Sequence, residues 1–256
     1  MLHCTVKLRL TLACACLAVH ALGDHMSNQC ALITNNPSIQ VEIEIEIKRS
    51  KVMRIAQNTL WFNKTLVFIN ALMPLGMLAW DGMHRQLGVN PVEFLTRIFG
   101  VLTLVFILIT LAITPLRKQF GWGFLIKYRR MLGLFAFFYG CLHFITYIGF
   151  DRSWSLSSTV DDVIKRPFIA FGMASFLMLI PLAITSTDKM LHRLGAKRWL
   201  KLHKLIYILA MGGVVHFYMI VKSDVFYPVL FGLVLAILLA YRLYAHGQKS
   251  IPKKRI

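Results

Sequence analysis

The chain has 256 residues, 57% of them hydrophobic, and a formal net charge of +18. An apolar share this large exceeds that of soluble globular proteins and predicts an integral membrane protein. The positive charge would suit a nucleic-acid partner, but Lys and Arg also collect at membrane faces, and their distribution among the loops favours that explanation. We therefore expect no nucleic acid among the partners.

Residues 1–52 differ in pattern from the rest of the chain. Lys7 and Arg9 precede an apolar run over residues 10–23 that is typical of a signal peptide, and alternating apolar and acidic residues over 41–47 predict a two-faced strand. A cleaved signal would place the following chain outside the membrane, whereas the loop charges place Met53 inside. We therefore expect residues 1–52 to be an atypical extension from an upstream start. Four of the five cysteines lie there, so no disulfide framework or zinc spacing is available: Cys4, Cys14, Cys16 and Cys30, with Cys141 outside it.

Six apolar runs follow, and each is close to the roughly 20 residues that a membrane-spanning helix needs. The runs cover residues 60–80, 98–116, 131–150, 167–185, 203–221 and 226–244. The predicted fold class is an all-α integral membrane protein, with a six-helix transmembrane bundle over residues 53–245 and a basic tail over 246–256. No internal repeat is evident. Without a GxGxxG or P-loop sequence, a nicotinamide or ATP site in this chain is not expected.

The charged residues sort by side of the membrane. Loops 117–130 and 187–204 are strongly basic and contain a single acid, Asp188. In the alternate loops, over 81–97 and 151–166, acidic and basic residues balance. The positive-inside rule therefore places the N- and C-terminal ends of the six-helix unit in the cytoplasm.

Two histidines lie at one depth on separate spans. His143 is about 12 residues into the third span and His216 about 13 into the fifth, and both spans enter from the cytoplasmic side. Each therefore lies about 18 to 20 Å from the inner end, in the outer half of the bilayer. Two level imidazoles can supply both axial ligands of a b-type haem, and Gly140, Gly212 and Gly213 leave room for a flat macrocycle. A single buried histidine would more simply form an interhelical hydrogen bond, so the matched pair carries the haem hypothesis.

A third histidine, His203, lies near the inner end of the fifth span, about 20 Å below His216, a separation that suits a second haem. The corresponding position on the third span is Arg130, which is not an iron ligand. Three interpretations stay open: a second haem with an unusual partner, a site for a quinone or a flavin, or a headgroup-region residue beside Lys201 and Lys204.

Strings around these histidines resemble the MsrQ family, formerly YedZ, of haem-binding membrane subunits of periplasmic methionine-sulfoxide reductase systems. They are RRMLGL at 129–134, LH at 142–143, ITST at 184–187, LGAKRW at 194–199 and LHKLIY at 202–207. The resemblance covers about residues 53–244 and implies a ferric-reductase-like domain in the bacterial inner membrane, with haem b and FMN. His143, His203 and His216 match the family's three functional histidines.

The resemblance also implies a role for the chain. Electrons would pass from the quinone pool to a periplasmic molybdopterin subunit that reduces methionine sulfoxide in oxidised proteins, so this chain would be a non-catalytic electron-transfer subunit. His143 and His216 would bind the outer haem iron, and His203 would serve electron entry or a second haem. The outer-loop acids offer a docking surface for the partner or are simply solvated. They are Asp151, Asp161 and Asp162, beside the basic residues Arg152, Lys165 and Arg166.

Three other classes of protein stay open. A stand-alone transmembrane cytochrome b, such as a ferric reductase, would share the histidine pair but act on iron chelates. A transporter would use the histidines for substrate or protons and predicts inverted repeats with broken helices. A structural membrane anchor predicts that the histidines are dispensable.

Overall fold

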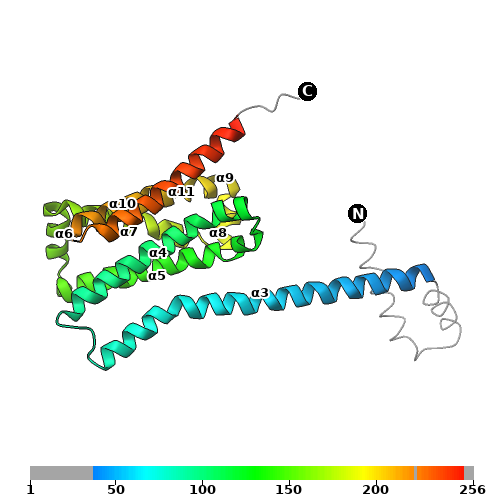
Figure 1. Ribbon diagram of the computed structural model, residues 1–256, viewed down its shortest axis with the longest axis horizontal. Coiled ribbons are helices and arrows are strands. Elements are labelled where there is room, and N and C mark those ends of the chain that lie inside the picture. Colours follow the sequence, from blue (N-terminus) through cyan, green and yellow to red (C-terminus); the bar gives the residue numbers. More distant parts are fainter. Residues whose placement is uncertain (1–36, 222–223, 251–256) are drawn as a thin grey trace. The chain divides into compact units, whose positions relative to one another are not determined.

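The computed structural model describes residues 37–221 and 224–250, and within these ranges every regular element is a helix. The signal-like run at 10–23, the four N-terminal cysteines and the last six residues lie outside the described residues. Figure 1 follows the helices in chain order. They are α3 (Pro37–Met83), α4 (Pro91–Phe120), α5 (Arg129–Thr146), α6 (Leu156–Lys165), α7 (Pro167–Ile184), α8 (Asp188–Leu194), α9 (Ala196–Leu202), α10 (Leu205–Ile220) and α11 (Phe226–Ser250), with a 3-10 turn at Gly123–Lys127 and a π-helical turn at Tyr147–Asp151.

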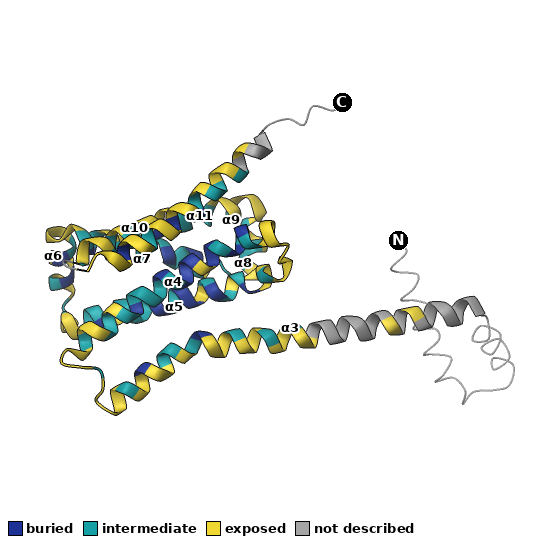
Figure 2. Ribbon diagram, viewed as in Figure 1, coloured by how far each residue is buried: buried dark blue, intermediate teal, exposed yellow. Residues whose placement is uncertain are grey.

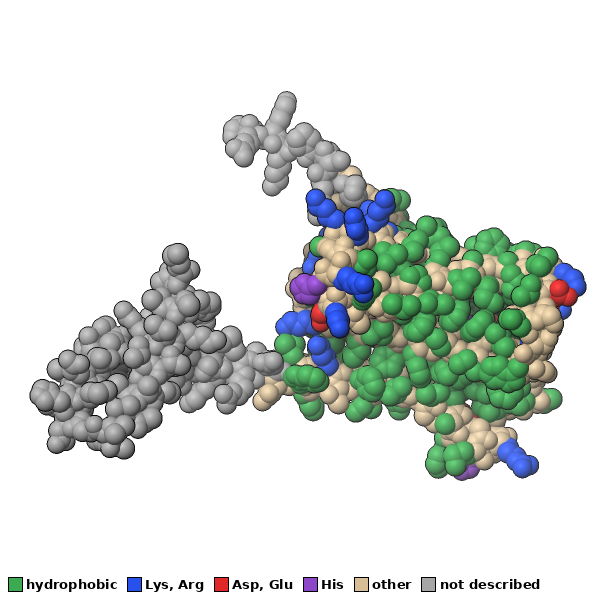
Figure 3. Space-filling view, turned by 180° about the vertical axis from the view of Figure 1, so that it is seen from behind, with side chains coloured by type: hydrophobic (Ala, Val, Ile, Leu, Met, Phe, Trp, Pro, Cys, Tyr) green, Lys and Arg blue, Asp and Glu red, His purple; other side chains and the backbone are tan. Residues whose placement is uncertain are grey.

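Six helical segments of the described chain are long and apolar enough to span a membrane, which confirms the predicted six-helix membrane protein. Hydrophobic side chains cover the face of the bundle drawn in Figure 3, and Lys and Arg gather at its ends. The segments are Asn58–Met83, Pro91–Phe120, Arg129–Asp151, Pro167–Ile184, Ala196–Ile220 and Phe226–Ala245.

The predicted strand at 41–47 is wrong, because these residues lie within α3. Glu, Lys and Arg favour a helix, and an alternating pattern makes a strand only where a neighbouring strand pairs with it. The chain divides into two compact units, Met1–Leu66 and Val67–Ile256. The histidine-bearing helices belong wholly to the second unit.

The core of the second unit lies where α4 packs against α5 and where α7 packs against α10. Leu111 on α4 and Tyr139 on α5 have no solvent exposure, and Figure 2 shows buried residues concentrated along these two helices. The Tyr139 ring stacks on Phe106 with a centroid separation of 5.5 Å. This packing fixes α5, and with it the height of His143.

Local sequence sets where the key helices begin and end. Asn90 accepts a hydrogen bond from the amide of Glu93, and Pro91 occupies the first turn of α4, a position where its missing N–H costs nothing. Pro167 opens α7 in the same way. The chain turns at His203 and Lys204, which separate α9 from α10, so the fifth span is built from two helices.

Candidate functional site

His143 projects from α5 towards α4. Its Nδ1 lies 2.8 Å from the carbonyl oxygen of Thr96, 47 residues earlier in the chain. A carbonyl oxygen only accepts hydrogen bonds, so Nδ1 carries the proton and donates it. The other ring nitrogen, Nε2, is then unprotonated and available as a ligand.

His216 is held in the same way on the opposite side. It projects from α10 towards α7, and its Nδ1 donates to the carbonyl oxygen of Phe168 at 2.5 Å. Again the acceptor fixes the tautomer and leaves Nε2 unprotonated. A metal-binding histidine usually donates its other ring N–H to a carboxylate, a backbone carbonyl or water, which fixes the tautomer and the ring orientation.

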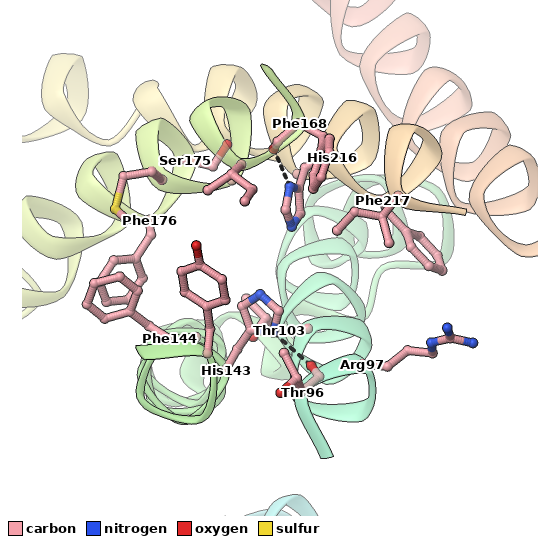
Figure 4. Close-up of a pocket in the computed structure, with 18 of the residues that line it drawn as sticks. Thr96, Arg97, Thr103, His143, Phe144, Phe168, Ser175, Phe176, His216 and Phe217 are labelled. Atoms are coloured by element: carbon pink, nitrogen blue, oxygen red, sulfur yellow. Dashed lines mark hydrogen bonds between the residues drawn. The ribbon is translucent and has the colours of Figure 1, made fainter. Parts of the chain in front are cut away.

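The two rings face each other across the bundle. Their centroids are 6.2 Å apart and their planes lie at 83°. In Figure 4 each hydrogen-bonded nitrogen points to a neighbouring helix, and the remaining nitrogens lie on the sides of the rings that face each other. One metal ion with a bond of about 2 Å to each Nε2 would separate the ring centroids by about 6 Å. The observed spacing therefore suits a single ion between them.

A cavity of about 820 Å³ surrounds the pair, between α4, α5, α7 and α10. This volume falls within the range of about 300–1,000 Å³ that is usual for cofactor sites. Its inner walls are mostly apolar and include Gly140, Phe144, Phe176 and Gly213, and its polar rim includes Asn90, Arg97, Arg152 and Arg166. Gly212 was expected to leave room for the macrocycle, but it serves the packing of α10 against α7. A Cβ built there would lie 2.4 Å from the Ser175 hydroxyl oxygen of α7.

The side chains available as ligands limit which metal-containing cofactor the cavity can hold. Over residues 37–221 and 224–250, no three His, Cys, Asp or Glu side chains gather closely enough to hold a metal ion. A protein site for a bare ion generally needs three or four such ligands. Two opposed imidazoles suit a metal that brings its remaining ligands with it, as iron does in haem. The cavity, the pair and the apolar walls all fit that group.

His203 lies away from this pair and does not line the cavity. Its ring stacks on Trp199 at a centroid separation of 3.8 Å, and its Nδ1 lies 3.1 Å from the Trp199 carbonyl oxygen. Its Nε2 is buried and has no hydrogen-bond partner among the described residues. Of the predicted site residues, the structure therefore brings together His143 and His216 but not His203.

An ion-pair network closes the end of the bundle that carries α6. Asp162 of α6 is buried and lies 2.7 Å from Arg152 and 3.4 Å from Arg166, and it accepts a 2.9 Å hydrogen bond from Tyr147. Burial opposes the charge of Arg152, but Asp151 and Asp162 outweigh it and raise the pKa of that guanidinium. Because Asp162 is enclosed, it cannot belong to a docking surface, whereas Asp161 is exposed.

Two of the three histidines predicted to lie in loops or the tail, His84 and His192, do not join the site. His84 is exposed, with its Nδ1 2.9 Å from the Trp80 carbonyl oxygen, and His192 is exposed on α8. The side chain of His246 lies outside the described residues.

Known proteins resemble this chain over the same region. The family described as ferric reductase like transmembrane component matches residues 97–214. The protein-methionine-sulfoxide reductase heme-binding subunit MsrQ of Herminiimonas arsenicoxydans is 50% identical over 188 residues, which are 73% of this chain and 86% of that protein. The subunit of the same name from Rhodospirillum rubrum is 46% identical over 69% of this chain and 85% of that protein. The one from Caulobacter vibrioides is 38% identical over 81% of this chain and 98% of that protein. No solved structure gave a significant match.

Proposed function

Because the chain belongs to the MsrQ family of protein-methionine-sulfoxide reductase heme-binding subunits, we propose that it is the haem b membrane subunit of such a reductase. In this role it carries electrons from the quinone pool across the bacterial inner membrane to a periplasmic molybdopterin subunit. That partner reduces methionine sulfoxide in oxidised periplasmic proteins. The sulfoxide chemistry then lies wholly in the partner, and this chain transfers electrons without acting on the substrate.

The observation that carries the proposal is the matched pair His143 and His216. Each imidazole donates its Nδ1 proton to a backbone carbonyl and directs its Nε2 towards the other ring. Bound between them, haem b supplies one-electron redox chemistry at a potential that axial ligands and burial tune. The protein supplies two fixed imidazoles, apolar walls that exclude water, and a place in the outer half of the span, close to a periplasmic partner.

For His203 we propose a separate task on the inner side, either electron entry or ligation of a second haem. Its buried Nε2 without a partner supports a ligand there, since a buried polar nitrogen left unpaired is costly. FMN belongs to the proposal only through the family, and no described residue marks its site.

We also propose that both ends of the six-helix unit lie in the cytoplasm. The inner loops around Arg129 and Lys197 are basic, and the outer loops are charge-balanced, as the positive-inside rule requires. A C-terminal fusion to a fluorescent protein should therefore fluoresce, and a fusion to periplasmic alkaline phosphatase should be inactive. The reverse pattern would contradict this orientation.

The experiment that tests the haem assignment is a reduced-minus-oxidised visible spectrum of the purified protein, with haem per chain from a pyridine haemochrome assay. We expect a sharp low-spin b-type spectrum, lost or strongly reduced in His143→Ala and His216→Ala. His192→Ala, which removes an exposed histidine, is the matched control and should leave the spectrum unchanged. His203→Ala should retain at least part of the signal. A wild-type haem content in either ligand variant would contradict the assignment.

One observation favours a second candidate function. The match to the ferric reductase like family covers residues 97–214 and includes His143 but ends before His216. A stand-alone ferric reductase would bind haem equally and reduce iron chelates. The two functions are separated by mixing the reduced protein with a purified molybdopterin partner or with ferric citrate and measuring the rate of haem reoxidation. Only the physiological acceptor should reoxidise the haem rapidly when the acceptor concentration is low.

A further inference from the structure

The two histidines are supported by the same local arrangement, repeated in two pairs of helices. His143 donates to the carbonyl of Thr96, and the residue four positions after Thr96 is Gly100. His216 donates to the carbonyl of Phe168, and the residue four positions after Phe168 is Gly172. Each imidazole therefore meets a helix at a carbonyl and a glycine one turn apart.

Helix geometry explains why the fourth residue matters. In an α-helix the amide of residue i+4 donates to the carbonyl of residue i, and the Cα–Cβ bond points back towards the N-terminus. A side chain at i+4 therefore lies over the carbonyl where the imidazole must approach. A Cβ built on Gly100 would be 3.0 Å from Nδ1 of His143, and one built on Gly172 would be 2.7 Å from Nδ1 and Cε1 of His216. The second contact is the closer one.

Three short sequence matches accompany this arrangement, so the two helix pairs resemble each other in sequence as well as in contacts. Each match recurs after 71 to 73 residues, and α4 and α7 cross in the same direction because one span lies between them. The histidine pair thus lies between two related helix pairs, α4 with α5 and α7 with α10. The matches are FG at 99–100 and 171–172, LAIT at 111–114 and 182–185, and HF at 143–144 and 216–217.

We propose that Gly100 and Gly172 are positioning residues that set the plane of each axial imidazole and its Nδ1–H hydrogen bond. The proposal rests on the proposed function, since it concerns haem ligation by His143 and His216. Neither glycine touches the iron. Each acts through its histidine, by keeping open the space that the ring occupies beside the helix when its Nδ1 reaches the carbonyl.

The test compares four alanine variants of the full-length protein in detergent. Gly100→Ala and Gly172→Ala place a methyl group against an imidazole. Gly133→Ala, on the same helix as His143, places a methyl group where nothing lies within 4 Å. Gly140→Ala adds a methyl group to the same cavity, but it meets Leu179 at 3.4 Å and no histidine.

The readouts are haem per chain, the electron paramagnetic resonance (EPR) spectrum of the oxidised protein and the midpoint potential. For Gly172→Ala we expect a severalfold lower haem content or a changed low-spin EPR signal. Gly100→Ala, with its longer contact, should keep most of its haem but show shifted g-values and midpoint potential. Gly133→Ala should match the wild type in all three readouts. Gly140→Ala lies in the cavity wall, so it reports crowding of the cavity without contact to a histidine, and it should change the g-values less than either Gly100→Ala or Gly172→Ala.

Three results would decide against the proposal. A wild-type EPR spectrum and haem content in both Gly100→Ala and Gly172→Ala would show that the histidines tolerate the methyl groups. An equal change in Gly140→Ala would assign the effect to cavity crowding. An equal change in Gly133→Ala would assign it to helix composition. A wild-type protein without haem would instead overturn the proposed function, so the two failures are distinguishable. Gly100→Ala, the milder variant, keeps the test open if Gly172→Ala does not fold.

Discussion

The imidazole planes of His143 and His216 stand at 83° to each other, close to perpendicular. Each plane is fixed by a different helix, because His143 donates to Thr96 on α4 and His216 donates to Phe168 on α7. The angle is therefore a property of how the two helix pairs pack. A hydrogen bond from the Nδ1–H of a ligand histidine to a carbonyl holds its ring in one orientation.

This angle predicts the EPR signal of the oxidised protein. Perpendicular imidazole planes make two of the iron d orbitals, dxz and dyz, nearly degenerate and give a strongly anisotropic low-spin signal with one prominent low-field feature. Parallel planes give a rhombic signal with three resolved lines. We expect the anisotropic form at liquid-helium temperature. A rhombic spectrum from the haem that His143→Ala removes would contradict the observed ring angle.

The buried carboxylate of Asp162 should matter far more to stability than its neighbour Asp161. Asp162→Ala removes the 2.7 Å partner of Arg152 and leaves it only the 3.5 Å pair with the more exposed Asp151. The loss of one partner from an enclosed ion pair costs up to about 3–5 kcal/mol of unfolding free energy. Asp161 makes an exposed 3.1 Å pair with Lys165, so Asp161→Ala should cost no more than about 0.5 kcal/mol.

Thermal unfolding of both aspartate variants in one detergent measures the difference. Equal unfolding temperatures would show that the ion-pair network around Asp162 does not hold α6 to the bundle. The same pair of variants also tests docking, since Asp161 is exposed while Asp162 is enclosed. Slower electron transfer to a periplasmic partner in Asp161→Ala, at unchanged stability, would identify a docking residue.

The sequence predicts part of this architecture well and part of it poorly. Run length and hydropathy are local properties, so the six spans could be found, and the rise per residue placed His143 and His216 at one depth. Their hydrogen-bond acceptors could not be found, because Thr96 and Phe168 contribute backbone carbonyls that no side-chain pattern marks. The matching positions of Gly100 and Gly172 could not be recognised from the sequence either, because they depend on which carbonyl each histidine contacts.

The ion pair between Arg130 and Asp188 predicts a pH effect. Its atoms are 2.6 Å apart, and the hydrogen bond from Arg130 lowers the pKa of the Asp188 carboxyl below its ordinary value. A lowered pKa in the folded protein means that the pair stabilises at pH values above the ordinary Asp pKa of about 3.9. That contribution is lost as the pH falls through the lowered folded-state value. It should be small, because both side chains are substantially exposed.

A double-mutant cycle isolates this pair. Asp188→Asn and Arg130→Gln should each reduce the loss of unfolding temperature between neutral pH and pH values below the ordinary Asp pKa of about 3.9, and the double variant should add nothing further. Additive effects of the two substitutions would mean that the two charges do not interact in solution.

Arg242 should hold the last helix to the bundle. Its guanidinium on α11 donates to the carbonyl oxygen of Leu111 at 2.8 Å and to the Thr114 hydroxyl at 3.2 Å, and it also donates to the Tyr207 hydroxyl. The guanidinium carbon lies 4.9 Å from the centroid of the Tyr207 ring. These contacts tie α11 to α4 and α10 through one cation.

Arg242→Met keeps the length of the side chain and removes its donors. Hydrogen bonds to a charged group contribute about 1.5–3 kcal/mol, so we expect a loss of that order in unfolding free energy. Tyr207→Phe removes one acceptor and keeps the ring, and it should cost about 0.5–1.5 kcal/mol. Arg198→Met, at an exposed position on α9, is the matched control and should be nearly neutral. If Arg242→Met unfolds at the temperature of Arg198→Met, then packing alone holds α11 in place.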